Sequence, residues 1–208
     1  MHVIVESNFV LEIAFQQEEY TFCERICEGA KANAYSLHLP QYALTETFEK
    51  LRPLRNQREA NQEYLLKQIT QHRREAECDA DAMDALSLAL TNLLSERTQV
   101  QTRRLYTTVG ELAQLATVIL FTPVLVAEAY TKAQEHSLSP QDSLIYASVL
   151  AGLRALPADS PKLFVSRNAD DFNKPAIKAE LHALGCEYLS NFKAAAGRLQ
   201  AFAKRNLK

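Results

Sequence analysis

Short apolar segments alternate with longer amphipathic ones along this chain, and the alternation restricts the folds that it can adopt. Helical periodicity follows each strand-like segment, which favours a parallel sheet, because parallel neighbours need a long and usually helical crossover. We therefore expect an α/β fold: a three-layer α/β/α sandwich with a mostly parallel sheet of four or five strands. The predicted strands are 2–5, 35–39, 117–121, 162–166 and 187–189.

The segment 49–106 differs in composition from the rest of the chain. It contains no glycine and only one proline, Pro53, and polar stretches separate its periodic apolar positions. This pattern predicts two long helices in an antiparallel hairpin that turns near 79–84. Because 208 residues suit one domain, we expect a single domain over 1–208 with the helical insertion inside it. The insertion is either a solvated arm or an arm that contacts a substrate or partner.

Overall charge and cysteine content exclude several classes of protein. The net charge is −2, from 23 basic and 25 acidic residues, so the whole chain does not attract nucleic acid or anionic membranes. Four scattered cysteines predict reduced thiols rather than a disulfide scaffold or a zinc site. The N-terminal segment lacks the pattern of a signal peptide, and polar residues interrupt the apolar stretch 112–130. We expect a cytoplasmic protein with no membrane association.

Acidic and amide side chains follow the predicted strands, whereas phosphate-loop, serine-hydrolase and zinc-protease motifs are lacking. Glu6 and Asn8 come directly after the first strand, and Glu46 lies in the helix after the second. Asp142 lies in the first turn of a helix that begins Ser-Pro, and Asp171 follows the fourth strand. Each could be a cap or a turn residue, but the carboxyl ends of parallel strands are where such sheets bind ligands.

Four segments in this order resemble a PIN domain, the nuclease family that includes the toxins of bacterial toxin–antitoxin pairs. They include the Pro-x-Asp helix start and the turn Ser-x-Asn-x-x-Asp-Phe. The resemblance covers both ends of the chain, about 1–50 and 107–192, and leaves the helical insertion between them. The matching segments are 3–11, 39–46, 138–147 and 164–172.

The resemblance implies a divalent-metal-dependent endoribonuclease that hydrolyses phosphodiester bonds. RNA is then the substrate, and an antitoxin protein and a second copy of the chain, in a homodimer, are the candidate protein partners. Carboxylates suit Mg²⁺ or Mn²⁺, which prefer oxygen ligands, and a cation relieves the repulsion between clustered acids. By resemblance, the catalytic and metal-binding acids are Glu6, Glu46, Asp142 and Asp171, and the residues that position water or phosphate are Asn8, Ser166 and Asn168.

Glu6 departs from the family pattern, which usually has aspartate at this position. The additional methylene moves the carboxylate by roughly 1.5 Å, and a shift of that size can cost about 10²-fold in rate where positioning is strict. Either the site has adapted to glutamate, or the enzyme is weak, or the protein is a catalytically degenerate module that binds nucleic acid or protein.

Basic residues at both ends of the insertion are candidates for substrate binding. Arg52, Arg55 and Arg58 follow Glu46 in the same helical region, and Arg103 and Arg104 lie where the hairpin returns to the sheet. Because the chain is slightly acidic overall, RNA phosphates need a local positive site. We expect both basic groups to lie near the base of the hairpin, and Arg52, Arg55 and Arg103 to contact RNA.

Overall fold

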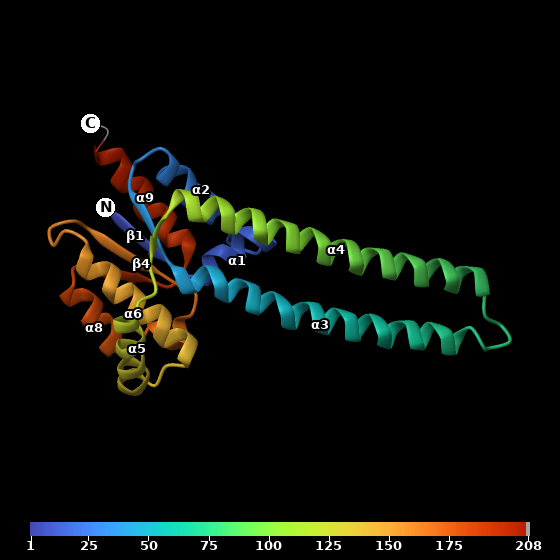
Figure 1. The fold of residues 1–208 in the computed structure, drawn as a ribbon. Coiled ribbons are helices and arrows are strands. Elements are labelled where there is room, and N and C mark those ends of the chain that lie inside the picture. Colours follow the sequence, from blue (N-terminus) through green and yellow to red (C-terminus); the bar gives the residue numbers. More distant parts are fainter. Residues whose placement is uncertain (207–208) are drawn as a thin grey trace.

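The structure, a computed structural model that describes residues 1–206, contains one five-stranded sheet, helices on both of its faces and a long helical hairpin (Figure 1). All strands are parallel, and their order across the sheet is β3-β2-β1-β4-β5. The predicted α/β sandwich with a helical insertion is therefore confirmed. The strands are β1 (His2–Val5), β2 (Ser36–Pro40), β3 (Thr117–Ile119), β4 (Lys162–Val165) and β5 (Cys186–Leu189).

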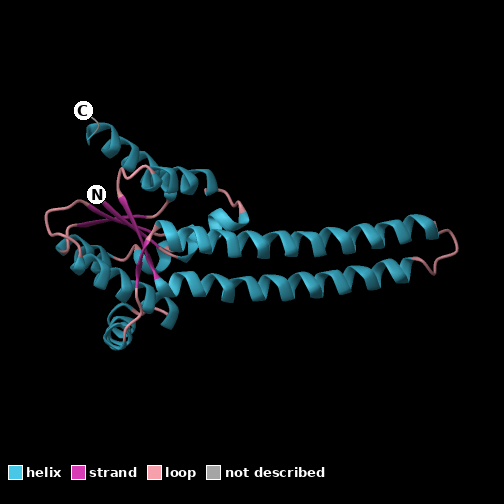
Figure 2. Ribbon diagram, turned by 45° about the horizontal axis from the view of Figure 1, so that its top comes forward, coloured by secondary structure: helices cyan, strands magenta, loops and turns pink. Residues whose placement is uncertain are grey.

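Helices cover both faces of the sheet, as Figures 1 and 2 show. On one face, α1 packs against α2, and α2 packs against α9, which contacts β4 and β5. On the other face, α5 packs against α6, which contacts β2 and β3, while α8 contacts β5. The helices of the two layers are α1 (Ser7–Phe15), α2 (Tyr20–Lys31) and α9 (Phe192–Asn206) on the first face, and α5 (Pro123–His136), α6 (Pro140–Ala155) and α8 (Pro175–Ala183) on the second.

The two central strands form the middle of the core. In β1, Val3, Ile4 and Val5 are completely buried, and in β4 Phe164 and Val165 are also completely buried. A strand covered on both faces must be apolar on both, so β1 reads as a continuous apolar run rather than an alternating one. The predicted central position of the first strand follows from this pattern.

Two helices have other bounds in the structure than their sequence patterns predict. The apolar spacing over 9–32 predicts one helix capped by Asn8, but the structure has α1 and α2, separated where Gln16 adopts a left-handed conformation with φ of 50°. Glu6, and not Asn8, caps α1. The pattern over 173–184 predicts a second helix, which begins only at Pro175 as α8 and follows a separate short helix, α7 (Ala169–Phe172). Proline favours such a first helical position and disfavours helix in the residue before it.

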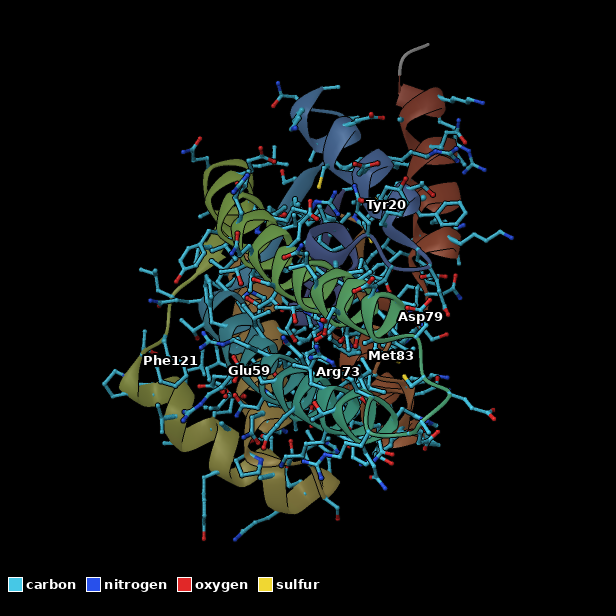
Figure 3. All side chains as sticks on the ribbon, turned by 90° about the vertical axis from the view of Figure 1, so that its right-hand side faces the viewer. Tyr20, Glu59, Arg73, Asp79, Met83 and Phe121 are labelled. Atoms are coloured by element: carbon cyan, nitrogen blue, oxygen red, sulfur yellow. The ribbon has the colours of Figure 1, made fainter. Side chains whose placement is uncertain are left out.

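The hairpin consists of α3 (Gln41–His72) and α4 (Ala80–Leu115), which extend away from the sheet (Figures 1 and 2). Its turn spans 73–79, earlier than the predicted 79–84, because the Asp79 side chain caps α4 by accepting a hydrogen bond from the Ala82 N–H at 3.0 Å. Figure 3 shows the molecule along the hairpin, with the turn at 73–79 toward the viewer. The sequence pattern predicts a separate short helix near 110–116, but α4 continues to Leu115, so arm and core share a continuous helix.

None of the helices in residues 1–206 is both long enough and apolar enough to cross a membrane. The four cysteines are free, and three of them, Cys23, Cys27 and Cys186, are buried. Burial raises the pKa of Cys27 and of Cys186 to about 12, which keeps both thiols protonated at neutral pH.

Two histidines on neighbouring strands make the folded state sensitive to acid. His38 in β2 is buried, and its Nε2 lies 3.1 Å from Nδ1 of His2 in β1. Burial, and then the charge of His2, lowers the pKa of His38 from 6.5 to about 4. Between these values the unfolded chain takes up a proton that the folded chain excludes, so the free energy of unfolding should fall as the pH falls through this window. Urea unfolding of the wild type and of His38→Gln, above and inside the window, tests this. An equal loss in both proteins would assign the effect to other groups.

Candidate active site

The predicted acids lie at the carboxyl ends of the two central strands. In the order β3-β2-β1-β4-β5, the chain moves outward from β1 to one edge and then returns to β4, so the direction of winding changes between β1 and β4. A parallel sheet opens a crevice at such a switch point, which is where open α/β sheets bind their ligands. Glu6 directly follows β1, and Ser166 directly follows β4. The sequence position of both residues therefore places them beside the crevice.

Glu6 is a buried carboxylate with one satisfied and one unsatisfied oxygen. Its Oε2 accepts hydrogen bonds from the Ser7 hydroxyl and from the Asn8 backbone N–H, both at 2.9 Å. Its Oε1 is buried and has no hydrogen-bond partner. Burial raises the pKa of Glu6, and nearby Glu46 raises it further, although the two hydrogen bonds and Lys50 oppose the shift. A buried polar atom without a partner is costly, so this oxygen is suited to meet a cation or a donor.

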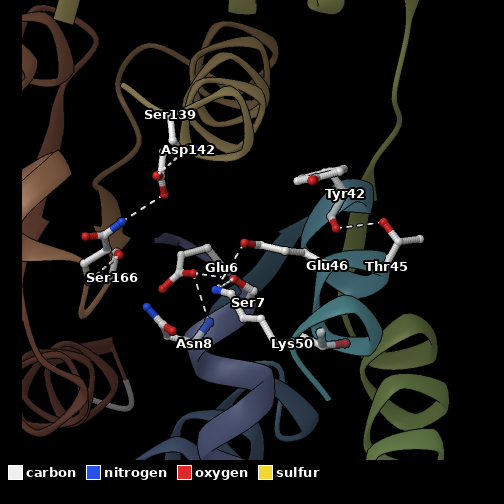
Figure 4. A network of polar contacts seen from close by, with 12 residues as sticks. Glu6, Ser7, Asn8, Tyr42, Thr45, Glu46, Lys50, Ser139, Asp142 and Ser166 are labelled. Carbon is white, nitrogen blue, oxygen red and sulfur yellow. Dashed lines mark hydrogen bonds and ion pairs between the residues drawn. The ribbon is translucent and has the colours of Figure 1, made fainter. Parts of the chain in front are cut away.

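Glu46 supplies a second buried carboxylate from α3. It is 6% exposed, and Figure 4 shows its side chain pointing from the helix toward Glu6. Lys50, one turn further along α3, places its Nζ 3.1 Å from Glu46 Oε1 and 3.2 Å from Ser7 Oγ. The sequence analysis missed Lys50. Its i,i+4 spacing from Glu46 is a helical ion-pair spacing that could have identified it.

Asn168 brings the other two predicted acids together. Its Nδ2 donates to Oδ1 of Asp142 and to Oδ2 of Asp171, both at 2.9 Å. The Ser166 hydroxyl accepts a hydrogen bond from the Asn168 backbone N–H at 3.0 Å and so shapes the turn after β4. The Ser139 hydroxyl caps α6 by accepting from the Asp142 N–H at 3.1 Å, as the Ser-Pro helix start predicts.

The four acids thus form two pairs rather than a single compact cluster: Glu6 lies beside Glu46 (Figure 4), and Asn168 joins Asp142 to Asp171. Within residues 1–206, no three Asp, Glu, His or Cys side chains are grouped as ligands of one metal ion. The Lys50 ammonium faces Glu46, and the Asn168 amide separates Asp142 from Asp171. The donor chemistry still fits a hard divalent cation, because the region offers carboxylate oxygens and the unsatisfied Oε1 of Glu6.

The arginines predicted to contact RNA, Arg52, Arg55 and Arg103, form no hydrogen bond or ion pair with the four acids in the described part of the chain. Arg52 is exposed, and Arg55 forms an exposed ion pair with Glu59 at 2.9 Å. Arg55 and Arg103 line a groove between α3 and α4 that includes none of the four acids. Arg58 borders both this groove and a second pocket, which contains the site residue Asn8.

This second pocket, of about 660 Å³, lies where the hairpin meets α1 and the turn after β4. Arg58, Arg97 and Arg167 line it together with Asn8. Arg58 belongs to the basic group predicted near the base of the hairpin, whereas Arg97 and Arg167 were not predicted, because they lie far from this group in the sequence. Searches of protein-family models, curated proteins and solved structures find no match to this chain.

Proposed function

We propose that this protein is a divalent-metal-dependent endoribonuclease of the PIN-like type. The observation that supports this best is the Oε1 atom of Glu6, a buried carboxylate oxygen without a partner at the switch point of the sheet. A second buried carboxylate, Glu46, lies on the facing helix. Two buried acids near each other favour a cation between them, because Lys50 pairs with Glu46 and leaves Oε1 of Glu6 without a partner.

Glu6, Glu46, Asp142 and Asp171 would hold Mg²⁺ or Mn²⁺. A bound ion of this kind polarises the scissile phosphate and lowers the pKa of an attacking water. Neighbouring residues fix the orientation of the Glu6 carboxylate. Ser7 and the Asn8 N–H hold Oε2 of Glu6, which leaves Oε1 available to a ligand.

Three further residues orient Asp142 and Asp171 or balance the charge of Glu46. Asn168 fixes the orientation of Asp142 and Asp171, and Ser166 fixes the turn that carries Asn168. Lys50 balances the charge of Glu46, so an incoming cation competes with its ammonium group.

The test is RNA cleavage by the purified protein with Mg²⁺ or Mn²⁺, and by Asp142→Asn. We expect the variant to lose about 10²-fold in rate, because the amide is a poorer metal ligand. Its thermal stability in metal-free buffer should not change, because Asn at 142 still offers an oxygen to Asn168 and Ser139 still caps the helix. A large loss of stability would show that Asp142 is only a structural cap. Full activity would remove it from the site.

A catalytically silent RNA-binding module is the second candidate, and Lys50 favours it. An ammonium group already sits 3.1 Å from Glu46 and reduces the need for a metal. The same assay separates the two candidates, since a silent module binds RNA but leaves it intact with both metals. If cleavage is found, expression in bacteria that arrests growth, with Asp142→Asn harmless, would support the proposed role as the toxin of a toxin–antitoxin pair.

A further inference from the structure

The pocket at the base of the hairpin gathers positive charge from segments far apart in the sequence. Arg58 comes from α3, Arg97 from α4, and Arg167 from the turn between β4 and α7. Glu12 and Glu18 also line it. An arginine that forms an ion pair with one of these glutamates is less available to a ligand.

Arg167 is the arginine whose charge is already compensated. Its guanidinium pairs with the buried Glu12 and, at 3.3 Å, with the exposed Glu18. This residue therefore holds the turn after β4 against α1. We assign it a structural role in the wall of the pocket.

Arg58 and Arg97 are not compensated in this way. Arg58 donates hydrogen bonds to the side-chain oxygens of Gln101 and Thr98, which are neutral acceptors, so its guanidinium is held in place without losing its charge. Arg97 is exposed and forms no ion pair with any of the described side chains. Burial, together with the charge of Arg97, lowers the pKa of Arg58. Two guanidinium groups that disfavour each other's charge are a site at which an anion is stabilising.

The pocket adjoins the candidate active site through two residues. Asn8 is one of its lining residues, and the backbone N–H of Asn8 donates to Glu6 Oε2 at 2.9 Å. Arg167 lies between Ser166 and Asn168 in the turn after β4, and the Asn168 side chain donates hydrogen bonds to Asp142 and Asp171. An RNA strand whose scissile phosphate is bound at the proposed metal site can therefore extend toward the arginines.

We infer that this pocket binds a backbone phosphate of single-stranded RNA, with Arg58 and Arg97 as its ligands, and so holds the strand beside Glu6. The inference rests on the proposed function. A guanidinium presents several donors in a plane and binds a phosphate through two of them, and Arg58 keeps donors beyond those it gives to Gln101 and Thr98. The pocket is open and of about 660 Å³, which admits a polymer backbone rather than enclosing a small ligand.

The experiment measures binding of a short fluorescein-labelled single-stranded RNA by anisotropy, in EDTA to prevent cleavage and over a series of salt concentrations. Arg58→Gln/Arg97→Gln should weaken binding by roughly tenfold for each arginine. The slope of log K against log salt should flatten by about 0.7 for each lost phosphate contact. Arg97→Gln alone provides a second measurement, because Arg97 is exposed and its replacement leaves the packing of the helices intact.

The matched control is Arg55→Gln/Arg103→Gln, which removes the same charge from the same hairpin but from the other groove. We expect it to change affinity by less than about threefold. A larger effect in this control than in Arg58→Gln/Arg97→Gln would place the strand in the other groove, as the sequence alone suggests, and would overturn the inference. An unchanged salt slope in Arg97→Gln would also overturn it.

Cleavage assays on the same proteins separate this inference from the proposed function. Wild-type cleavage that Arg58→Gln/Arg97→Gln leaves unaffected, together with unchanged binding, would refute the pocket and retain the nuclease. Binding that depends on the two arginines, without cleavage in either metal, would retain the pocket and refute the nuclease. A wild-type protein that does not bind the RNA would refute both.

Discussion

Glu6→Gln should reduce the rate of metal-dependent RNA cleavage by at least about a thousandfold, equivalent to about 4 kcal/mol in the barrier. Glu6 holds the unsatisfied buried oxygen on which the proposed metal site depends, and an amide removes its charge while keeping its size. The amide oxygen can still accept the hydrogen bonds from Ser7 and from the Asn8 N–H. The fold should therefore be retained, which makes the loss of activity specific.

The same variant should be more stable than the wild type in metal-free buffer at neutral pH. Burial raises the pKa of Glu6 above 4.5, so ionising it costs folding free energy as the pH rises above that unfolded value. The difference in melting temperature should disappear below pH 4.5, where the carboxyl is protonated in both states. The control is Glu49→Gln, because Glu49 is an exposed acid about one turn from Glu46 on α3. It should change neither the cleavage rate nor the melting temperature. Wild-type cleavage by Glu6→Gln would remove Glu6 from the site.

Glu12→Ala should lower the free energy of unfolding by about 3 kcal/mol. The side chain of Glu12 is 1% exposed, and its two oxygens join three segments. One oxygen pairs with Arg167, and the other accepts the Glu19 N–H at 2.8 Å. Removing the carboxylate leaves the Glu19 N–H and the Arg167 guanidinium without this partner and frees the turn that carries Asn168.

Glu18→Ala provides the matched control, because Glu18 pairs with the same arginine at 3.3 Å but its side chain is 84% exposed. An exposed ion pair contributes little, so we expect a change below about 0.5 kcal/mol. Urea unfolding monitored by circular dichroism measures both variants. Equal and small losses would show that the Glu12 contacts do not hold the turn after β4.

Local sequence patterns were sufficient for most of the secondary structure. The sequence pattern predicts a helix over 123–136, which are the bounds of α5, and α6 begins at Pro140 behind the Ser139 cap. Strand β1 was predictable because an apolar run on both faces suits only a covered central strand. Such features depend on the spacing of a few neighbouring residues, which is why the sequence displays them.

The division of the first long helix was not predictable in the same way. Residues 16–19 are polar but compatible with helix, and the pattern on either side has helical spacing. The break is stabilised by Glu12, whose carboxylate accepts the Glu19 N–H and pairs with Arg167 from the far end of the chain. A contact across 155 positions leaves no periodic signal near the helix.

By itself, then, the sequence determined the parallel α/β sandwich, the inserted hairpin and the place of the acids after their strands, because these follow from local periodicity and from the geometry of parallel crossovers. Only the tertiary structure decided which groups meet those acids. Lys50 beside Glu46 and Asn168 between Asp142 and Asp171 depend on side-chain orientations in the folded chain. The pocket of Arg58, Arg97 and Arg167 likewise exists only because packing brings three distant segments together, and charges become a binding site through their distances in space rather than their spacing in sequence.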